Sequence, residues 1–159
     1  MAKSELGRPT LYLDVDGVIL PFDRSPFEIK TLNGLYSYAP EVVRRIGSTC
    51  LELVWCTSWG KRELAELVDE IDALRNGRQL ELPGANTPWI ARKLDAAISD
   101  QEIAPTPFVW ADDDITSRER DEIERLFADR PHLLVQPDRR LGVDEVQLRS
   151  IEDFAHRFE

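Results

Sequence analysis

Short apolar runs alternate with amphipathic segments along most of this chain, and the alternation restricts its fold more than any other feature. The strand-length runs lie at 10–14, 51–56, 79–82, 107–111 and 133–136. Segments with helical patterns lie between and after them, at 40–46, 61–74, 88–98, 117–127 and 143–158. Because strands joined by helices pair in parallel through right-handed crossovers, the pattern predicts a three-layer α/β fold. We expect a parallel sheet of about five strands with helices on both faces.

The length and the segment between the first two strands bear on domain organisation. A chain of 159 residues with 42% hydrophobic residues fits one domain with a single core, so we expect one domain over 1–159. The segment 17–39 contains Pro21, Pro26 and the turn signal Asn33-Gly34, without a long apolar period. It therefore predicts a short flap and no separate cap domain. The candidate site should then be open unless a partner subunit covers it.

Composition excludes several classes of function. The formal net charge is −10, from 20 basic and 30 acidic residues, which argues against extended nonspecific binding of nucleic acids. The apolar runs are too short to cross a membrane, and segment 1–10 lacks the apolar core of a signal peptide. Cys50 and Cys56, both near one strand, would lie too far apart for a disulfide. We expect a cytoplasmic monomer or homodimer with free thiols.

The first polar motif follows the first apolar run, where Asp14 and Asp16 are separated by one residue and Gly17 comes directly behind. Two carboxylates this close repel each other unless a cation or a shared proton lies between them. Strand ends are also where open α/β sheets bind ligands. The alternative is a turn that is rich in aspartate and glycine because both residues form turns readily.

The second motif follows the next apolar run, where Thr57, Ser58 and Trp59 precede a helical segment. Hydroxyls before a helix can donate to phosphate oxygens beside the helix amides. The alternative is that Thr57 or Ser58 caps that helix. Trp59 could stack on a base or a sugar, whereas we expect Trp55 in the core.

The third motif is the run Asp112, Asp113 and Asp114 after the fourth apolar run. Carboxylate oxygens at a strand end suit Mg²⁺, which takes one or two protein carboxylates and keeps several waters. The alternative is an acidic capping loop, since Thr116 and Glu119 fit a capping box. A cap needs only one aspartate, so the run favours a metal.

One basic residue could reach these motifs. On the helix predicted at 88–98, Lys93 lies at the edge of the apolar stripe and Arg92 nearly opposite it. Lys93 can extend along the core toward a site, while we expect Arg92 to face solvent. The alternative for Lys93 is an ordinary solvated flank.

In their order along the chain, these motifs resemble those of the haloacid dehalogenase superfamily. The segment DVDGV is similar to its first motif, Thr57 to its second, Lys93 to its third and Asp112-Asp113 to its fourth. The resemblance implies a Rossmann-like phosphohydrolase of the minimal-cap type. Within the superfamily, WCTSWG and VWADDDI look similar to the phosphatase-like domains of multi-part RNA repair proteins, and the Thr-Ser pair also resembles deoxyribonucleotidases.

The resemblance implies a role for each motif residue in a Mg²⁺-dependent phosphomonoester hydrolase. Asp14 would be the nucleophile that forms an aspartyl-phosphate, and Asp16 the general acid and base. The Mg²⁺ ligands would be Asp14, Asp16 through its backbone carbonyl, Asp112 and Asp113. The groups that contact the phosphate or substrate would be Thr57, Ser58, Lys93 and Trp59.

The substrate expected from these features is a nucleotide or a phosphorylated nucleic-acid end. The alternatives are a small phosphorylated metabolite, or a catalytically silent module that binds partners in a Mg²⁺- or nucleotide-dependent way. Asp16 disfavours a dehalogenase, because carbon–halogen cleavage needs no proton donor at that position.

Overall fold

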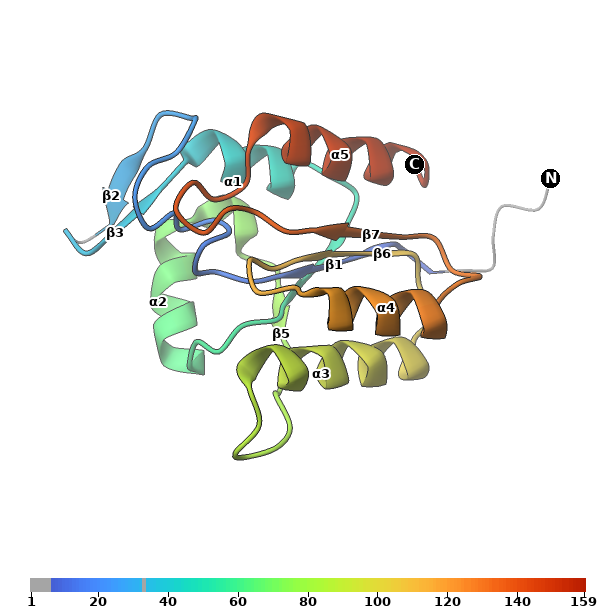
Figure 1. Cartoon of the computed structure of the whole chain (residues 1–159). Helices are drawn as coiled ribbons and strands as arrows, with labels where there is room; N and C mark the ends of the chain where they lie inside the picture. Colours follow the sequence, from blue (N-terminus) through green and yellow to red (C-terminus); the bar gives the residue numbers. More distant parts are fainter. Residues whose placement is uncertain (1–6, 33) are drawn as a thin grey trace.

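A five-stranded parallel sheet forms the centre of the computed structural model, which describes residues 7–32 and 34–159 (Figure 1). Its strands are β1 (Thr10–Leu13), β4 (Glu52–Trp55), β5 (Arg78–Gln79), β6 (Phe108–Ala111) and β7 (His132–Val135). They are arranged in the order β5-β4-β1-β6-β7, with every pair parallel. The expected α/β, Rossmann-like fold is therefore confirmed. Because β1 is central, the residues that follow it have a strand end on either side.

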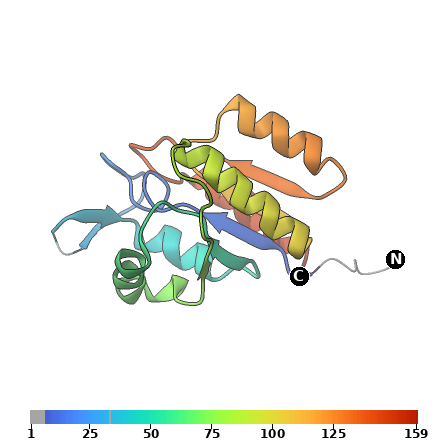
Figure 2. The ribbon, with the colours of Figure 1, turned by 90° about the horizontal axis from the view of Figure 1, so that it is seen from below.

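Helices cover both faces of the sheet. They are α1 (Pro40–Gly47), α2 (Lys61–Glu70), α3 (Trp89–Ile103), α4 (Ser117–Leu126) and α5 (Glu145–His156). Side chains alternate along β1, so Leu11 and Leu13 belong to the core under α1, α2 and α5. Tyr12, between them, belongs to the core under α3 and α4. The view from below shows α3 and α4 side by side across the sheet (Figure 2).

Several predicted elements differ in extent from the observed ones. The helix predicted at 88–98 continues to Ile103 as α3, and the strand predicted at 79–82 covers only Arg78–Gln79. The segment predicted as a helix over 61–74 is an α-helix only to Glu70, and a 3₁₀ turn, η1 (Asp72–Leu74), follows. Ile71 leaves the helical conformation, at φ −109° and ψ 74°. The side chains of Ile71 and Leu74 are both buried, and the break allows them to reach the core. Packing against the core therefore outweighs the helical period at this position.

The flap is a small antiparallel hairpin between β1 and α1. Its strands are β2 (Lys30–Leu32) and β3 (Tyr36–Tyr38). Of the predicted Asn33-Gly34 turn, Gly34 has a positive φ of 69°, while Asn33 lies outside the described residues. The first part of the flap is held by backbone hydrogen bonds from Phe22 N to Arg139 O and from Val143 N to Val18 O. These bonds bring the loop after β1 against the loop after β7.

Two further sequence expectations can be compared with the structure. Cys50 and Cys56 are both free, as the strand spacing predicted. Among the described helices, none combines the length and apolarity that crossing a membrane requires. The segment used to judge a signal peptide begins with residues 1–6, which lie outside the described part of the chain.

Candidate active site

Three of the predicted motifs meet at the carboxyl edge of the sheet. The backbone pairing of the central strands continues beyond their ends, through hydrogen bonds from Asp14 N to Ala111 O (3.0 Å) and from Cys56 N to Leu13 O (2.9 Å). Asp112 N likewise donates to Val135 O at 3.0 Å. Asp14, Thr57 and Asp112 therefore follow adjacent strands at one edge. This is the edge at which parallel sheets bind ligands.

Lys93 lies between two of these carboxylates. Its Nζ donates to Asp14 Oδ2 at 2.9 Å and to Asp112 Oδ2 at 2.8 Å. The three residues are 3%, 4% and 0% exposed, respectively. The lysine reaches them from α3, so it is neither a solvated flank nor in contact with solvent. Lys93, Asp14 and Asp112 are called the buried triad below.

Burial sets the electrostatics of the buried triad. The pKa of Asp14 is raised to about 7, chiefly by burial and also by the negative charge of Asp112, against the opposing effect of Lys93. Burial also raises the pKa of Asp112, although Lys93 acts in the opposite direction. For Lys93, burial alone would lower the pKa, but the two carboxylates outweigh it and raise the pKa above its usual value. The triad thus holds negative charge that a single lysine does not fully compensate.

Asp113 adds a third carboxylate beside the triad. Carboxylate oxygens of Asp14, Asp112 and Asp113 all lie within 4.8 Å of one another, and such a group could hold a metal ion. The Asp113 side chain is only 7% exposed, and Arg139 Nε lies 3.3 Å from its Oδ2. Burial, together with the charges of Asp114 and Asp14, raises the pKa of Asp113 to about 6. A divalent cation here would relieve the repulsion among these carboxylates.

Gly17 makes room for this carboxylate. Its φ of +71° lies in the left-handed region, where a residue with a side chain is strained. A Cβ at this position would lie 2.6 Å from Asp113 Oδ2 and 2.8 Å from Arg139 Cβ. The glycine behind the two aspartates therefore permits both the turn and the approach of Asp113.

Asp14 and Asp16 have different side-chain partners: Lys93 donates to the carboxylate of Asp14, and Trp59 donates to that of Asp16. The indole Nε1 of Trp59 donates to Asp16 Oδ2 at 2.9 Å. Asp16 is partly exposed, and its side chain is not among the three carboxylates that could share a metal. The two aspartates of the first motif are thus divided between a buried cluster and the rim of the site.

Thr57 and Ser58 also differ in burial. Thr57 is 2% exposed, and its Oγ1 accepts a hydrogen bond from Trp59 N at 3.2 Å, whereas Ser58 is exposed. The alternative that either residue caps the following helix is wrong, because α2 has Gly60 as its N-cap. For the aspartate run, the capping box is formed by Thr116 and Glu119, which leaves Asp112 for the triad.

Two arginines have contacts that the sequence did not predict. Arg92 was expected to face solvent, but its guanidinium donates to Pro83 O and Leu82 O and stacks on Trp89. The loop before α3 folds back over the helix and provides these partners. Arg139, which contacts Asp113 and Asp114, was not anticipated. The sequence spacing does not predict its contact with the third motif. The contact forms because the loop after β7 folds back against that motif.

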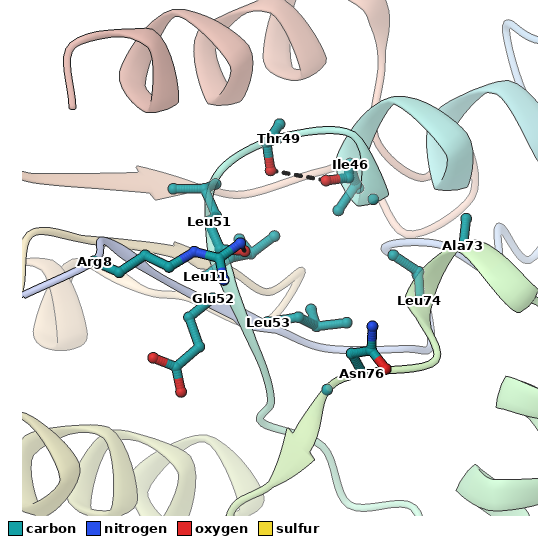
Figure 3. A pocket seen from close by; sticks show the side chains of 12 residues that line it. Arg8, Leu11, Ile46, Thr49, Leu51, Glu52, Leu53, Ala73, Leu74 and Asn76 are labelled. Carbon is teal, nitrogen blue, oxygen red and sulfur yellow. Dashed lines mark hydrogen bonds between the residues drawn. The ribbon is translucent and has the colours of Figure 1, made fainter. Parts of the chain in front are cut away.

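Away from the candidate site, a hollow of about 160 Å³ lies toward the amino ends of β1 and β4 (Figure 3). Two of its polar side chains already have partners within the chain. The guanidinium of Arg8 donates to Cys50 O and Leu51 O, and Thr49 Oγ1 donates to Ile46 O at 2.8 Å. The carboxylates that could share a metal ion lie instead at the opposite edge, in and beside the buried triad.

Comparisons of the chain with protein-family models, with curated proteins and with solved structures found no match. The chemistry of the site is therefore inferred from its own residues and distances.

Proposed function

We propose that this protein is a Mg²⁺-dependent phosphomonoester hydrolase of the haloacid dehalogenase type, acting through an aspartyl-phosphate on Asp14. One observation carries the proposal: buried Lys93 bridges Asp14 and Asp112, with Asp113 beside them. A lysine buried between carboxylates is costly for a fold to maintain, and such groups concentrate at functional sites.

The donor set fits a hard divalent cation. All three groups are carboxylates, and their oxygens lie within 4.8 Å of one another. Lys93 occupies one oxygen of Asp14 and one of Asp112, so each carboxylate keeps acceptor capacity for a cation. The ligands would be Asp14, Asp112, Asp113 and the backbone carbonyl of Asp16. When bound, Mg²⁺ would reduce the repulsion between the anionic nucleophile and the anionic phosphate.

Asp14 is the proposed nucleophile. Its Oδ1 accepts a hydrogen bond from Val15 N at 2.8 Å, and Lys93 holds Oδ2, so the carboxylate is oriented by two donors. An oxygen of Asp14 attacks phosphorus and the bond from phosphorus to the leaving oxygen breaks, which transfers the phosphoryl group to the protein. Attack by water on that phosphorus then releases inorganic phosphate and restores the carboxylate.

Asp16 is the proposed proton carrier for both steps. It gives a proton to the leaving oxygen in the first step and takes one from the attacking water in the second. Its partly exposed position at the rim supports this role, because protons must exchange with solvent between turnovers. Burial of Asp14 and exposure of Asp16 give the two neighbouring carboxylates different environments, as two different roles require.

Thr57, Ser58 and Lys93 are the proposed phosphoryl-binding groups. Lys93 provides the fixed positive charge, while the hydroxyls lie at the end of the neighbouring strand. Such donors stabilise the charge that spreads over the phosphoryl oxygens in the transition state. We propose a nucleotide or a phosphorylated nucleic-acid end as the substrate. The hairpin of β2 and β3 is too short to form a separate cap domain, and an open site of this kind suits such a substrate.

The proposal is tested by hydrolysis assays with matched aspartate variants. The wild-type chain is assayed with an aryl phosphate, with nucleoside monophosphates and with end-phosphorylated RNA and DNA oligomers, in Mg²⁺ and in excess EDTA. Asp112→Asn removes a member of the buried triad, and Asp114→Asn removes the adjacent exposed carboxylate that pairs with Arg139. We expect hydrolysis only with Mg²⁺, a loss of about 10²-fold or more for Asp112→Asn, and less than about threefold for Asp114→Asn.

Full activity in EDTA, or equal losses in the two variants, would contradict the proposed site. Mg²⁺ binding without hydrolysis of any phosphorylated compound would favour the binding module instead. Hydrolysis of small sugar phosphates but of no nucleotide or oligomer would retain the chemistry and exclude the proposed substrate class.

A further inference from the structure

The proposed proton carrier Asp16 has one side-chain partner in the described chain, and that partner is an indole. Trp59 Nε1 donates to Asp16 Oδ2 at 2.9 Å, across 43 positions of sequence. An indole N–H can only donate a hydrogen bond, and it has no charge that changes with pH. It therefore fixes one oxygen of Asp16 as an acceptor and leaves the other oxygen to carry the proton.

Trp59 is itself held from several sides. Its backbone N–H donates to Thr57 Oγ1 at 3.2 Å, and its carbonyl accepts from Gln79 Nε2 at 2.8 Å. The ring of Tyr36 packs against the indole, with centroids 5.4 Å apart and planes at 53°. These contacts come from the loop after β4, from β5 and from the hairpin. The indole is thus anchored by elements that do not carry Asp16.

We propose that Trp59 is a positioning residue, which acts through Asp16 and does not stack on the substrate. The inference rests on the proposed function, because it assigns Trp59 to the proton-transfer step of that reaction. A carboxylate on a loop samples several rotamers, and proton transfer requires it to be within hydrogen-bond reach of the leaving oxygen. The indole N–H restricts that sampling before the substrate arrives.

The surroundings of the ring argue against stacking. Tyr36 packs against the indole, and Trp59 also lines a hollow of about 180 Å³ between the hairpin and α2. Three glutamates share that lining: Glu63, Glu66 and Glu70. Their negative charges would repel a phosphorylated nucleic acid. The part of the ring that is not covered therefore borders a surface unsuited to a phosphorylated substrate.

Trp59→Phe separates the two roles, because it retains an aromatic ring and removes the N–H. If Trp59 positions Asp16, kcat for a poor leaving group, such as an alkyl phosphate, should fall about tenfold. Hydrolysis of 4-nitrophenyl phosphate, whose leaving group needs no proton, should change by less than about threefold, with KM unchanged for both. Trp89→Phe is the matched control, since Trp89 is exposed and stacks under Arg92. It should alter neither rate.

Equal losses with both leaving groups, or a loss confined to KM, would overturn the positioning role. If Trp59→Phe does not fold, Gln79→Leu loosens the backbone of Trp59 without contact with Asp16. It should give a smaller loss with the same dependence on the leaving group, and a uniform loss would overturn the inference.

A spectroscopic readout tests the hydrogen bond independently of activity. The chain has four tryptophans, so its ¹⁵N–¹H spectrum should contain four indole signals, which single Trp→Phe variants assign. Asp16→Ala should shift the Trp59 signal and speed its hydrogen exchange, and it should leave the Trp89 signal in place. An unchanged Trp59 signal would overturn the inference. A wild-type chain without hydrolytic activity would instead overturn the proposed function, and with it the positioning role of Trp59 in that reaction.

Discussion

Two clusters in this molecule each place one basic side chain between two carboxylates, in different surroundings. In the buried triad, Lys93 bridges Asp14 and Asp112. Between α1 and α5, Arg45 bridges Glu145 and Glu152, at 2.9 and 2.7 Å. The surface cluster is accessible to water, with its two carboxylate side chains 43% and 24% exposed. The surface cluster also contains Glu41, 3.7 Å from Arg45, and Arg149, which pairs with Glu145 at 2.8 Å.

The two clusters shift their carboxylate pKa values in opposite directions. Hydrogen bonds from Arg45 lower the pKa of Glu145 and of Glu152. In the buried triad, desolvation exceeds the attraction of Lys93, and the pKa values of Asp14 and Asp112 rise. Burial therefore distinguishes a cluster suited to chemistry from one that only joins two helices.

The largest contrast should be in catalysis. Asp14→Asn removes the proposed attacking anion with little change of shape, and we expect hydrolysis to fall by about 10⁴-fold or more. Glu152→Gln in the surface cluster should retain hydrolysis within about twofold. Steady-state assays with circular dichroism as a check on folding would measure both. Comparable losses would mean that the triad is structural like its surface counterpart.

The next contrast concerns stability. Lys93→Met leaves two buried carboxylates without their cation, and we expect a loss of about 3–5 kcal/mol in the metal-free protein. Arg45→Met should cost less, because exposed ion pairs contribute little and their carboxylates remain hydrated. Urea unfolding in EDTA would measure both. If Mg²⁺ binds beside Asp14 and Asp112, its addition should stabilise all three chains, and the difference from the wild type should become smaller for Lys93→Met and stay unchanged for Arg45→Met.

The smallest contrast concerns pH. The folded-state pKa of Asp14, about 7, exceeds the ordinary value, so the metal-free folded chain binds the proton more tightly than the unfolded chain. Stability should therefore fall as pH rises from about 4 through about 7, by on the order of 2–4 kcal/mol, and level off above. The lowered pKa values of Glu145 and Glu152 act in the opposite sense, because their contribution is lost as pH falls toward acid.

Urea titrations at several pH values would resolve these contributions. Asp14→Asn should flatten the decline between about pH 4 and 7, and Arg45→Met should reduce the loss at low pH. A decline unaffected by Asp14→Asn would assign it to other groups.

The sequence predicted the sheet and the strand-end position of the aspartates because both depend on local patterns. Apolar runs fix the strands, and the chain reverses where each run ends. The orientation of Lys93 could be inferred from its helical period, but its two partners depend on β1 and β6 being neighbours. β1 and β6 become neighbours only through crossover connections that span many residues of the sequence.

The Trp59–Asp16 bond and the role of Arg139 could not be predicted. Both join loops, and loop conformations follow from packing against other elements more than from local sequence. The end of α2 at Glu70 could not be predicted either. It depends on the packing of the Ile71 side chain into the core, which breaks the helical period.

The wide sequence separation within the buried triad has a consequence for how the protein acquires its chemistry. Lys93 and Asp14 are 79 positions apart, and each belongs to a different layer of the fold. Such contacts close long loops, and they form only when the intervening chain is in place. A chain that is still being synthesised, or is only half folded, carries the reactive carboxylate without the groups that orient it. The proposed reaction would thus be confined to molecules that have completed their fold.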